Sequence, residues 1–366
     1  MTPPANSAAD PCRGAGPPLE EAHAAAPGVP LESVRCAVCG ADDPRVLFWA
    51  GDRLSGRPGR FRVVRCRGCG LAYLSPRPTP RALADWYFDG YEPHQPPVPV
   101  RAARRGPFRR WIQSHAVRWY TRGLGFDPEE VRATLGRIDD LPPYFTFGFV
   151  PTRHGGRVLD VGCGTGSHLD IARRLGWETY GVEISPAASQ IARETLGLTV
   201  VTGALEDAGY PEAHFDVVTL FHVLEHLPDP VGTLREVARV LRPGGLALLA
   251  VPNHRSLAAF AFRSRWFPWE VPRHLYHFSP ASLAALLDRV ATLRLVRINY
   301  VPVPAGFTLS WEYLGRDHPW VGRMLSPTTV SRLGRVFAWA TALAGMGDSI
   351  VAYARKPAGE ARVSRR

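Results

Sequence analysis

One stretch, residues 157–166 with the sequence RVLDVGCGTG, constrains the fold of this 366-residue chain more than any other. An apolar run reaches Asp160 and then opens into three closely spaced glycines, Gly162, Gly164 and Gly166. Because glycine adopts a positive φ without steric cost, the sequence predicts a buried parallel strand that stops at a tight turn. A helix should follow this turn, with bare backbone beside a bound ligand.

The spacing and charge of the turn separate two classes of ligand. The glycines follow a GxGxG pattern, whereas dinucleotide sites have GxGxxG and a pyrophosphate at the helix N-terminus. A carboxylate at the strand end suits a ligand that carries an ammonium and a sulfonium. Glu183 ends the next apolar run, 23 residues after Asp160, where an acid can accept both ribose hydroxyls. These features favour S-adenosylmethionine over a nicotinamide dinucleotide.

Three later segments follow these two motifs in order. They are HFDVVTLFHVLEHLPDP at 214–230, LRPGGLALLAVPN at 241–253 and SIVAYARKP at 349–357. With the glycine turn and GVEIS, this order resembles the class I S-adenosylmethionine-dependent methyltransferases from about residue 155 to residue 356. The resemblance implies an α/β fold with a Rossmann-like sheet of seven strands, of which the last is antiparallel. A doubly wound domain with a different nucleotide site is the alternative.

The same resemblance implies the residues that contact the cofactor. His222 should flank the methionine end of the cofactor, and Glu225 should support that loop. Ala204 stands where many relatives carry Asp, so a backbone contact near Leu205 is expected there. Cys163 lies inside the glycine turn, where packing favours a small side chain. The expected cofactor-binding residues are Asp160, Gly162, Cys163, Gly164, Gly166, Glu183, Ile184, Leu205, Phe221 and His222.

Three histidines are the candidates for catalysis. Methyl transfer from a sulfonium is an in-line displacement, so the enzyme aligns a nucleophile and removes its proton where needed. His226 is the first candidate for a general base because imidazole titrates near neutrality; alternatively it starts a helix and bonds to backbone. His274 and His277 belong to PRHLYHFS, which resembles a substrate-side segment of the same group. Ser279 and the proline after it predict the start of a helix.

Two matched cysteine pairs lie near the N-terminus, and each is followed by glycine. Four thiolates complete a tetrahedral shell with no open position, which predicts a structural Zn²⁺ rather than a catalytic one. Two redox pairs or two disulfides are the alternatives. Residues 45–52 and 59–66 predict two ribbon strands, and a short aromatic helix should follow. Cysteine knuckles before this fold resemble a bacterial group that includes sugar and natural-product methyltransferases. The expected metal ligands are Cys36, Cys39, Cys66 and Cys69.

The chain carries a net charge of +11, almost wholly from arginine. This charge suits an anionic substrate, nucleic acid or a membrane surface without choosing among them. Residues 330–346 predict an apolar helix, which we expect to belong to the core; a cap over the pocket and contact with lipid are the alternatives. The expected parts are a disordered tail at 1–30, a zinc-binding ribbon module with an aromatic helix at 31–92, a basic helical connector at 93–150, a methyltransferase domain at 151–358 with a substrate-side insertion at 301–346, and a tail at 359–366.

Several absences narrow the function. No apolar run reaches the roughly 18 residues of a membrane span, and the N-terminus lacks signal-peptide features, so we expect a cytoplasmic protein. No cysteine follows Cys163, which disfavours C5-pyrimidine methylation. The sequence predicts methylation of a small molecule or a nucleotide- or lipid-linked sugar, on oxygen more than carbon. The alternatives are an RNA base methyltransferase, whose zinc module and basic connector hold RNA, and a cofactor-sensing scaffold.

Overall fold

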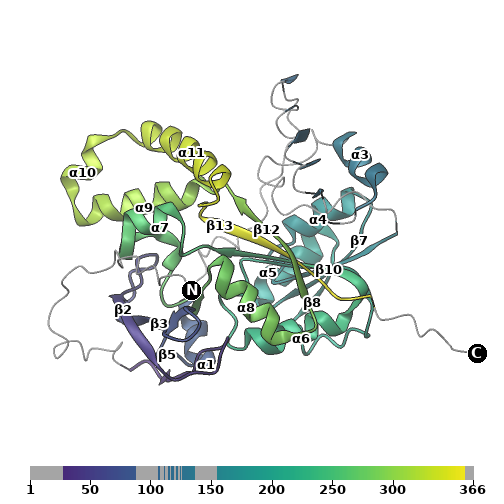
Figure 1. The fold of residues 1–366 in the computed structure, drawn as a ribbon, viewed down its shortest axis with the longest axis horizontal. Coiled ribbons are helices and arrows are strands. Elements are labelled where there is room, and N and C mark those ends of the chain that lie inside the picture. The colour runs from purple at the N-terminus through teal and green to yellow at the C-terminus, as the bar shows by residue number, and fades with distance from the viewer. Residues whose placement is uncertain are drawn as a thin grey trace, which may run out of the picture.

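A larger and a smaller β-sheet lie side by side in the computed structural model (Figure 1). Residues 1–27 of the predicted tail at 1–30, which include Cys12, lie outside the described residues, as do the predicted tail at 359–366 and most of the basic connector. The structure describes residues 28–87, 126–136 and 155–358, with a few single residues and pairs between 106 and 124.

The larger sheet has seven strands in the order β12-β13-β10-β9-β6-β7-β8. Strand β13 runs antiparallel to both of its neighbours, and β6, β7, β8, β9 and β10 run parallel to one another. This confirms the predicted sheet with an antiparallel last strand. The strands are β6 (Arg157–Val161), β7 (Glu178–Glu183), β8 (Thr199–Thr202), β9 (Phe215–Phe221), β10 (Leu241–Pro252), β12 (Arg294–Val301) and β13 (Ser349–Arg355).

Helices connect these strands and begin where the sequence offers caps. Ser185, Asp229 and Ser279 each accept a hydrogen bond from the first turn of the helix that follows, and a proline comes next. The helix predicted at Ser279 is therefore confirmed. The helices are α4 (Ser167–Arg174), packed on β6 and β7, α5 (Pro186–Leu196), packed on β7 and β8, α6 (Pro230–Val240), packed on β10, and α8 (Pro280–Val290), packed on α6 and β12.

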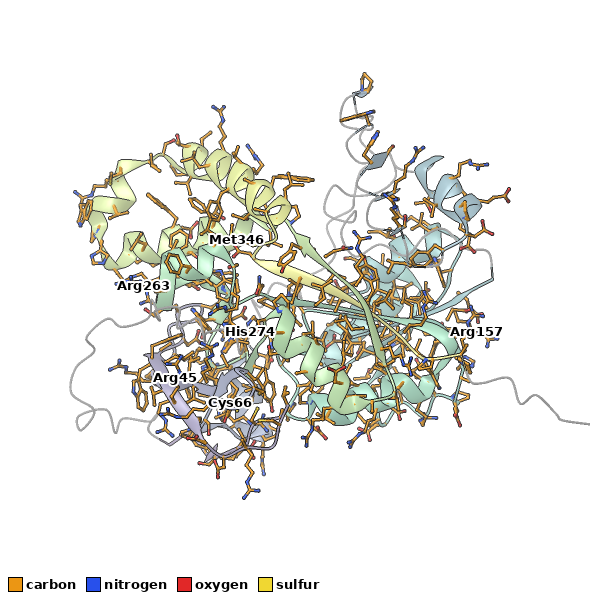
Figure 2. The ribbon with its side chains drawn as sticks, in the orientation of Figure 1. Arg45, Cys66, Arg157, Arg263, His274 and Met346 are labelled. Atoms are coloured by element: carbon orange, nitrogen blue, oxygen red, sulfur yellow. The ribbon has the colours of Figure 1, made fainter. Side chains whose placement is uncertain are left out.

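Because strands β6, β7, β8, β9 and β10 run parallel to one another, their carboxyl ends meet at one edge of the sheet. In Figure 2, Arg157 at the start of β6 lies at the far end of the molecule from His274 and Cys66. The carboxyl-end edge of the sheet therefore faces the smaller sheet. This arrangement brings the glycine turn and the N-terminal module to the same side.

The smaller sheet joins both parts of the chain. It has four antiparallel strands in the order β11-β4-β3-β2, and the predicted ribbon strands are confirmed as β2 and β3. Strand β11 comes from the PRHLYHFS segment, so the methyltransferase part of the chain completes the N-terminal sheet. One apolar core runs through both sheets. The strands are β2 (Pro44–Ala50), β3 (Phe61–Cys66), β4 (Ala72–Leu74) and β11 (Tyr276–His277).

Short elements complete the N-terminal module. Strand β1 (Leu31–Glu32) pairs with β5 (Arg77–Pro78). Within the described residues, the predicted aromatic helix consists of one turn each of α1 (Pro80–Leu83) and η1 (Ala84–Trp86), and Trp86 packs edge-on against Phe61 with ring centroids 5.6 Å apart. Trp86 therefore fixes these turns to the small sheet.

Residues between β12 and β13 form a helical insertion at the upper left of Figure 1. The helix expected at residues 330–346 forms as α11 (Pro327–Leu343), but only one of its faces belongs to the core. Val330 and Ala338 are buried, whereas Val336 is 69% exposed and Leu343 is 81% exposed. Among the described residues, no helix combines the length and apolar character that crossing a lipid bilayer requires. The helices of this region and its neighbours are α7 (Leu257–Phe262), η5 (Arg263–Arg265), η6 (Phe267–Trp269), α9 (Pro304–Asp317), α10 (Pro319–Met324) and α11 (Pro327–Leu343), and α3 (Pro128–Gly136) lies apart from them.

Candidate functional site

The glycine turn after β6 adopts a backbone that only glycine accommodates easily. Gly162, Gly164 and Gly166 have φ values of 68°, 53° and 84°. A Cβ atom at Gly162 would lie 2.4 Å from Cγ2 of Val223, and one at Gly166 would lie 2.4 Å from Cδ1 of Leu198. The turn therefore needs both the conformational freedom and the missing side chain of glycine.

Asp160 lies one residue before the end of β6 and is 3% exposed. Its Oδ1 accepts a hydrogen bond from Oγ1 of Thr219 at 2.6 Å, and its Oδ2 lies 3.4 Å from Nδ1 of His168. The ring of His168 packs edge-on against Phe221, with centroids 4.5 Å apart. Sequence reasoning missed Thr219 and His168, although the place of His168 in the first turn after the glycines was a signal.

Glu183 ends β7, next to β6, and is 5% exposed. Its Oε2 accepts from the backbone N–H of Gly164 and its Oε1 accepts from that of Ser185, both at 2.8 Å. Each oxygen keeps a further lone pair, so the carboxylate can accept hydroxyl donors as well. Ile184 directly after it is largely exposed. Both predicted acids therefore lie at neighbouring strand ends.

Two other predicted cofactor residues are buried. Leu205 is part of the main core, and Cys163 packs its sulfur against Gly181, where a Cβ atom would lie 2.7 Å from Sγ. Burial raises the pKa of the Cys163 thiol, which keeps it protonated and chemically quiet. The expected packing role of Cys163 agrees with this contact.

The end of β9 carries a strained residue. His222 has a φ of 57°, and its backbone N–H donates to the carbonyl of Ala250 at 2.9 Å. Its Nδ1 lies 3.2 Å from Oε1 of Glu225, whose side chain is buried. Burial opposes ionisation of Glu225, but the hydrogen bond and charge of His222 bring its pKa below the ordinary value. The loop predicted to flank the cofactor is thus held by this pair.

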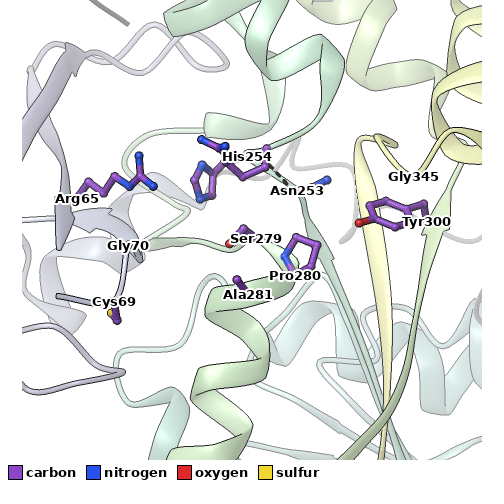
Figure 3. A pocket seen from close by; sticks show the side chains of 11 residues that line it. Arg65, Cys69, Gly70, Asn253, His254, Ser279, Pro280, Ala281, Tyr300 and Gly345 are labelled. Atoms are coloured by element: carbon purple, nitrogen blue, oxygen red, sulfur yellow. Dashed lines mark hydrogen bonds between the residues drawn. The ribbon is translucent and has the colours of Figure 1, made fainter. Parts of the chain in front are cut away.

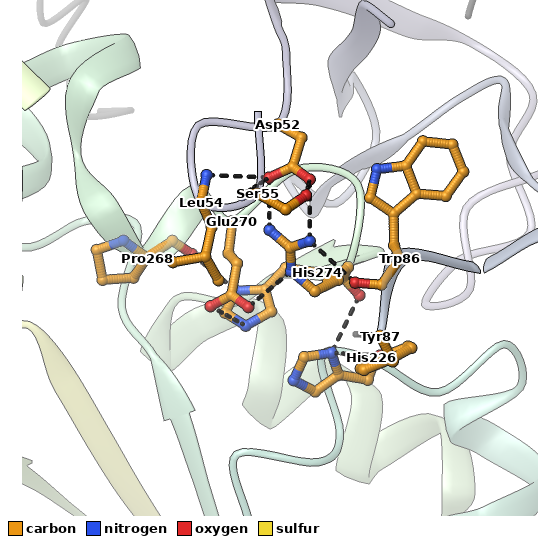
Figure 4. A network of polar contacts seen from close by, with 10 residues as sticks. Asp52, Leu54, Ser55, Trp86, Tyr87, His226, Pro268, Glu270 and His274 are labelled. Carbon is orange, nitrogen blue, oxygen red and sulfur yellow. Dashed lines mark hydrogen bonds and ion pairs between the residues drawn. The ribbon is translucent and has the colours of Figure 1, made fainter. Parts of the chain in front are cut away.

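Two of the three predicted catalytic histidines meet beside this loop. The rings of His226 and His274 have centroids 4.6 Å apart, and Nδ1 of His226 lies 3.0 Å from Oη of Tyr87 (Figure 4). Burial lowers the pKa of His226 to about 4, so this imidazole is neutral at pH 7. His277 lies in β11 with its ring 4.6 Å from that of Trp269 and is fully enclosed.

A buried ion network ties this loop to the N-terminal module. The guanidinium of Arg273 donates to both carboxylate oxygens of Asp52, at 2.7 and 3.1 Å, and to Oε1 of Glu270 at 3.0 Å (Figure 4). It also donates to the carbonyl of Trp86 at 3.2 Å. Sequence reasoning missed this network because its members lie 221 residues apart.

The four predicted metal ligands come together in one group. Sγ of Cys36 lies 3.3 Å from that of Cys69, and Sγ of Cys39 lies 3.4 Å from that of Cys66, so each contact joins one CxxC pair to the other. These distances are far longer than a disulfide bond, and all four thiols are free. This converging set of sulfurs is consistent with a structural zinc site.

A cavity of about 400 Å³ lies between the cysteine module and α8 (Figure 3). Arg65, His254 and Arg255 line it, together with Ser279 at the N-terminus of α8. Burial, and then the charges of the two arginines, lower the pKa of His254 to about 3. The cavity therefore has a positive electrostatic character without a charged histidine.

The fold and the site together define a class. A seven-stranded sheet with one antiparallel strand, a GxGxG turn after β6 and acids at two neighbouring strand ends are the features of a class I S-adenosylmethionine-dependent methyltransferase. Residues 134–290 match the family described as "Methyltransferase domain". This part of the chain is therefore a class I methyltransferase domain.

Individual relatives match the chain over part of their length. A solved S-adenosylmethionine-dependent methyltransferase from Mesorhizobium loti is 16% identical, covers 56% of this chain and 93% of its own, and has a TM-score of 0.38. The ubiquinone biosynthesis O-methyltransferase of Xanthomonas oryzae pv. oryzae is 36% identical over 158 residues. Its counterpart in Xanthomonas campestris pv. campestris is 34% identical. Either alignment covers 40% of this chain, which thus spans 65% of the length of these curated relatives.

Proposed function

We propose that this protein transfers the methyl group of S-adenosylmethionine to an oxygen atom of a small molecule or of a carrier-linked sugar. The S–CH₃ bond breaks, an O–CH₃ bond forms, S-adenosylhomocysteine leaves, and the acceptor hydroxyl gives up its proton. The observation that carries the proposal is the pair Asp160 and Glu183 at adjacent strand ends over a glycine turn. The curated relatives are O-methyltransferases by name, which favours oxygen over carbon as the acceptor.

The residues present fit this cofactor. Glu183 is anchored by two backbone N–H groups and still has lone pairs for the ribose hydroxyls. Asp160 supplies negative charge for the ammonium group, and the bare backbone of the turn leaves room beside it. Phe221, Leu205 and Ile184 are assigned to the walls around the cofactor. When bound, S-adenosylmethionine supplies an electrophilic methyl group.

The acceptor is assigned to the side of His226 and His274. These rings lie next to Glu225. The carboxylate of Glu225 also contacts His222, which belongs to the loop expected to flank the cofactor. A base with a pKa near 4 takes up a proton only weakly, so alignment of the acceptor should contribute more to the rate than proton removal by His226. His277 is the weaker candidate, because Trp269 covers its ring.

We also propose that the four cysteines hold a structural Zn²⁺. Gly40 and Gly70 follow the two CxxC pairs with φ values of 74° and 77°, as the tight turns around such an ion require. Exchange of Cys36 for Ser should release one zinc per chain, measured by metal analysis. Unchanged zinc content in that variant would contradict the assignment.

The nature of the acceptor follows from two surfaces. The positive cavity at Arg65 and Arg255 suits the phosphates of a nucleotide- or lipid-linked substrate. The exposed apolar face of α11 at Val336 and Leu343 lies among exposed arginines such as Arg335, which suits contact of a cytoplasmic enzyme with an anionic lipid surface. The RNA alternative rests on residues 93–126, which lie largely outside the described part.

The cofactor site is tested by replacing Asp160 with Asn. Loss of a buried charged group that contacts a cationic ligand should weaken S-adenosylmethionine binding about 10- to 100-fold, from about 1.5–3 kcal/mol for a charge-assisted hydrogen bond. Isothermal titration calorimetry measures the affinity. Asp216→Asn is the matched control. Asp216 lies near the start of β9, at the edge of the same sheet that is opposite to the glycine turn, and it pairs with Arg242.

Equal affinities for wild type and Asp160→Asn would show that the cofactor binds elsewhere. The acceptor itself is identified from the product: incubation with methyl-labelled cofactor and candidate hydroxylated compounds, followed by mass spectrometry, shows a gain of one methyl group. Label recovered on carbon or nitrogen would refute O-methylation while leaving the cofactor site intact.

A further inference from the structure

We propose that Glu225, His226 and His274 form a second metal site, which binds a divalent transition-metal cation on the acceptor side of the cofactor. One ligand atom from each residue lies within 4.8 Å of the other two. Glu225 and His226 follow β9 directly, and His274 comes from the loop before β11. This site is separate from the four-cysteine cluster.

The hydrogen bonds of both imidazoles leave the same ring nitrogen available. Nδ1 of His226 lies 3.1 Å from the carbonyl oxygen of Arg273 and 3.0 Å from Oη of Tyr87, a hydroxyl that can accept as well as donate. Nδ1 of His274 lies 2.8 Å from the carbonyl oxygen of Pro268. A carbonyl oxygen only accepts hydrogen bonds, so Nδ1 carries the proton in each ring. Nε2 of each neutral ring then presents a lone pair. This is the arrangement by which backbone carbonyls orient histidine ligands around metals.

The buried carboxylate beside these rings has one oxygen without a donor among the described residues. The side chain of Glu225 is 1% exposed; its Oε1 contacts His222, and its Oε2 has no hydrogen-bond partner among the described residues. Oε2 of Glu270 lies 3.5 Å from Nε2 of His274. A buried carboxylate oxygen without a donor is unfavourable. A cation held between Glu225 and the two rings would satisfy it.

The donor set indicates the kind of ion. Two imidazole nitrogens and one carboxylate oxygen form the ligand sets of catalytic zinc and of non-haem iron, which keep open positions for further ligands. Metal–ligand distances of about 2.1 Å place neighbouring ligands of a tetrahedral shell about 3.4 Å apart, so ligand atoms that lie within 4.8 Å of one another must close by up to about 1.4 Å. His226 is half-buried, which leaves a side from which a hydroxyl oxygen of the acceptor can reach the open positions.

The metal content of the full-length protein without a histidine tag tests the proposal. Wild type saturated with Zn²⁺ and freed of excess metal should hold two ions per chain. Glu225→Gln and His274→Ala should each hold one. Substitution with Co²⁺ separates the sites, because thiolate-to-cobalt charge-transfer bands report the cysteines and the remaining ligand-field bands report the second site. The two variants should lose only the second set of bands.

The matched control is His254→Ala, another enclosed imidazole whose Nε2 has no partner among the described residues and which lies outside the cluster. It should keep two ions. The proposal is overturned if wild type holds one ion, Cys36→Ser holds none and Glu225→Gln still holds one. Protons rather than a metal ion would then occupy the cluster of Glu225, His226 and His274. Calorimetry with S-adenosylmethionine is run in parallel: a protein that binds two ions but no cofactor would refute the proposed function alone.

Discussion

Replacing Arg273 with Met should destabilise the folded protein by about 3–5 kcal/mol, the range for breaking a buried ion pair at one partner. The side chains of Arg273 and Asp52 are both 0% exposed, and two hydrogen bonds join them. The substitution leaves Asp52 charged and buried. Its remaining donors are the backbone N–H groups of Leu54 and Ser55, and the Ser55 hydroxyl.

The pH dependence of this loss has a defined sign. Burial raises the pKa of Asp52, but the hydrogen bond and charge of Arg273 and the bonds from Ser55 bring it below the ordinary value of 3.8. A depressed pKa in the folded state contributes stability above the unfolded value and loses it as the pH falls through the folded one. The difference in the free energy of unfolding between wild type and Arg273→Met should therefore reach its full size near pH 6 and become smaller below about pH 4.

Urea denaturation followed by tryptophan fluorescence measures the free energy of unfolding for wild type, Arg273→Met, Asp52→Leu and the double variant. The double variant should be more stable than the sum of the single losses predicts, by about 1–3 kcal/mol, because it no longer leaves Asp52 charged without its guanidinium partner. A loss below about 1 kcal/mol in Arg273→Met, or strict additivity, would refute the reasoning. The matched surface control is Arg157→Met, whose ion pair with Glu178 is half exposed and should contribute less than about 1 kcal/mol.

Two further predictions concern single positions. Gly162→Ala should lower S-adenosylmethionine affinity and the melting temperature more than Gly244→Ala. Both glycines have a positive φ, but only at Gly162 would an added Cβ atom meet a neighbour, Val223, at 2.4 Å. Equal effects in calorimetry and thermal unfolding would exclude the contact with Val223 as the cause. Burial raises the pKa of Asp348 from 3.8 to about 6, so the folded state binds the extra proton and its stability falls as pH rises through that window. Asp348→Asn should remove about 3 kcal/mol of this decline between pH 4 and 7, and parallel stability curves would contradict it.

Many features of this protein could be predicted from short segments of its sequence. The glycine turn and the acids Asp160 and Glu183 could be predicted because each depends on the residue types within one short segment. The seven-stranded sheet with its antiparallel last strand was implied by the resemblance that the motifs carry in their order along the chain. The cysteine spacing likewise predicted the cluster that the structure assembles. Caps such as Ser279 mark helix starts for the same reason.

Contacts between segments that are distant in the chain could be identified only from the tertiary structure. The pairing of Thr219 with Asp160 follows from the register of β9 against β6. Periodicity predicted the helix α11, but it did not reveal that Leu343 faces outward, because an apolar pattern does not state what covers it.

The same holds for the acceptor side. PRHLYHFS could be linked to substrate by resemblance, yet its pairing with β4 and the place of Arg273 against Asp52 depend on an N-terminal module more than 200 residues away in the chain. Spacing alone does not encode such contacts, because folding chooses among many pairings by total burial and hydrogen bonding. The sequence thus determined which chemical groups are available, and the tertiary structure decided that Glu225, His226 and His274 meet.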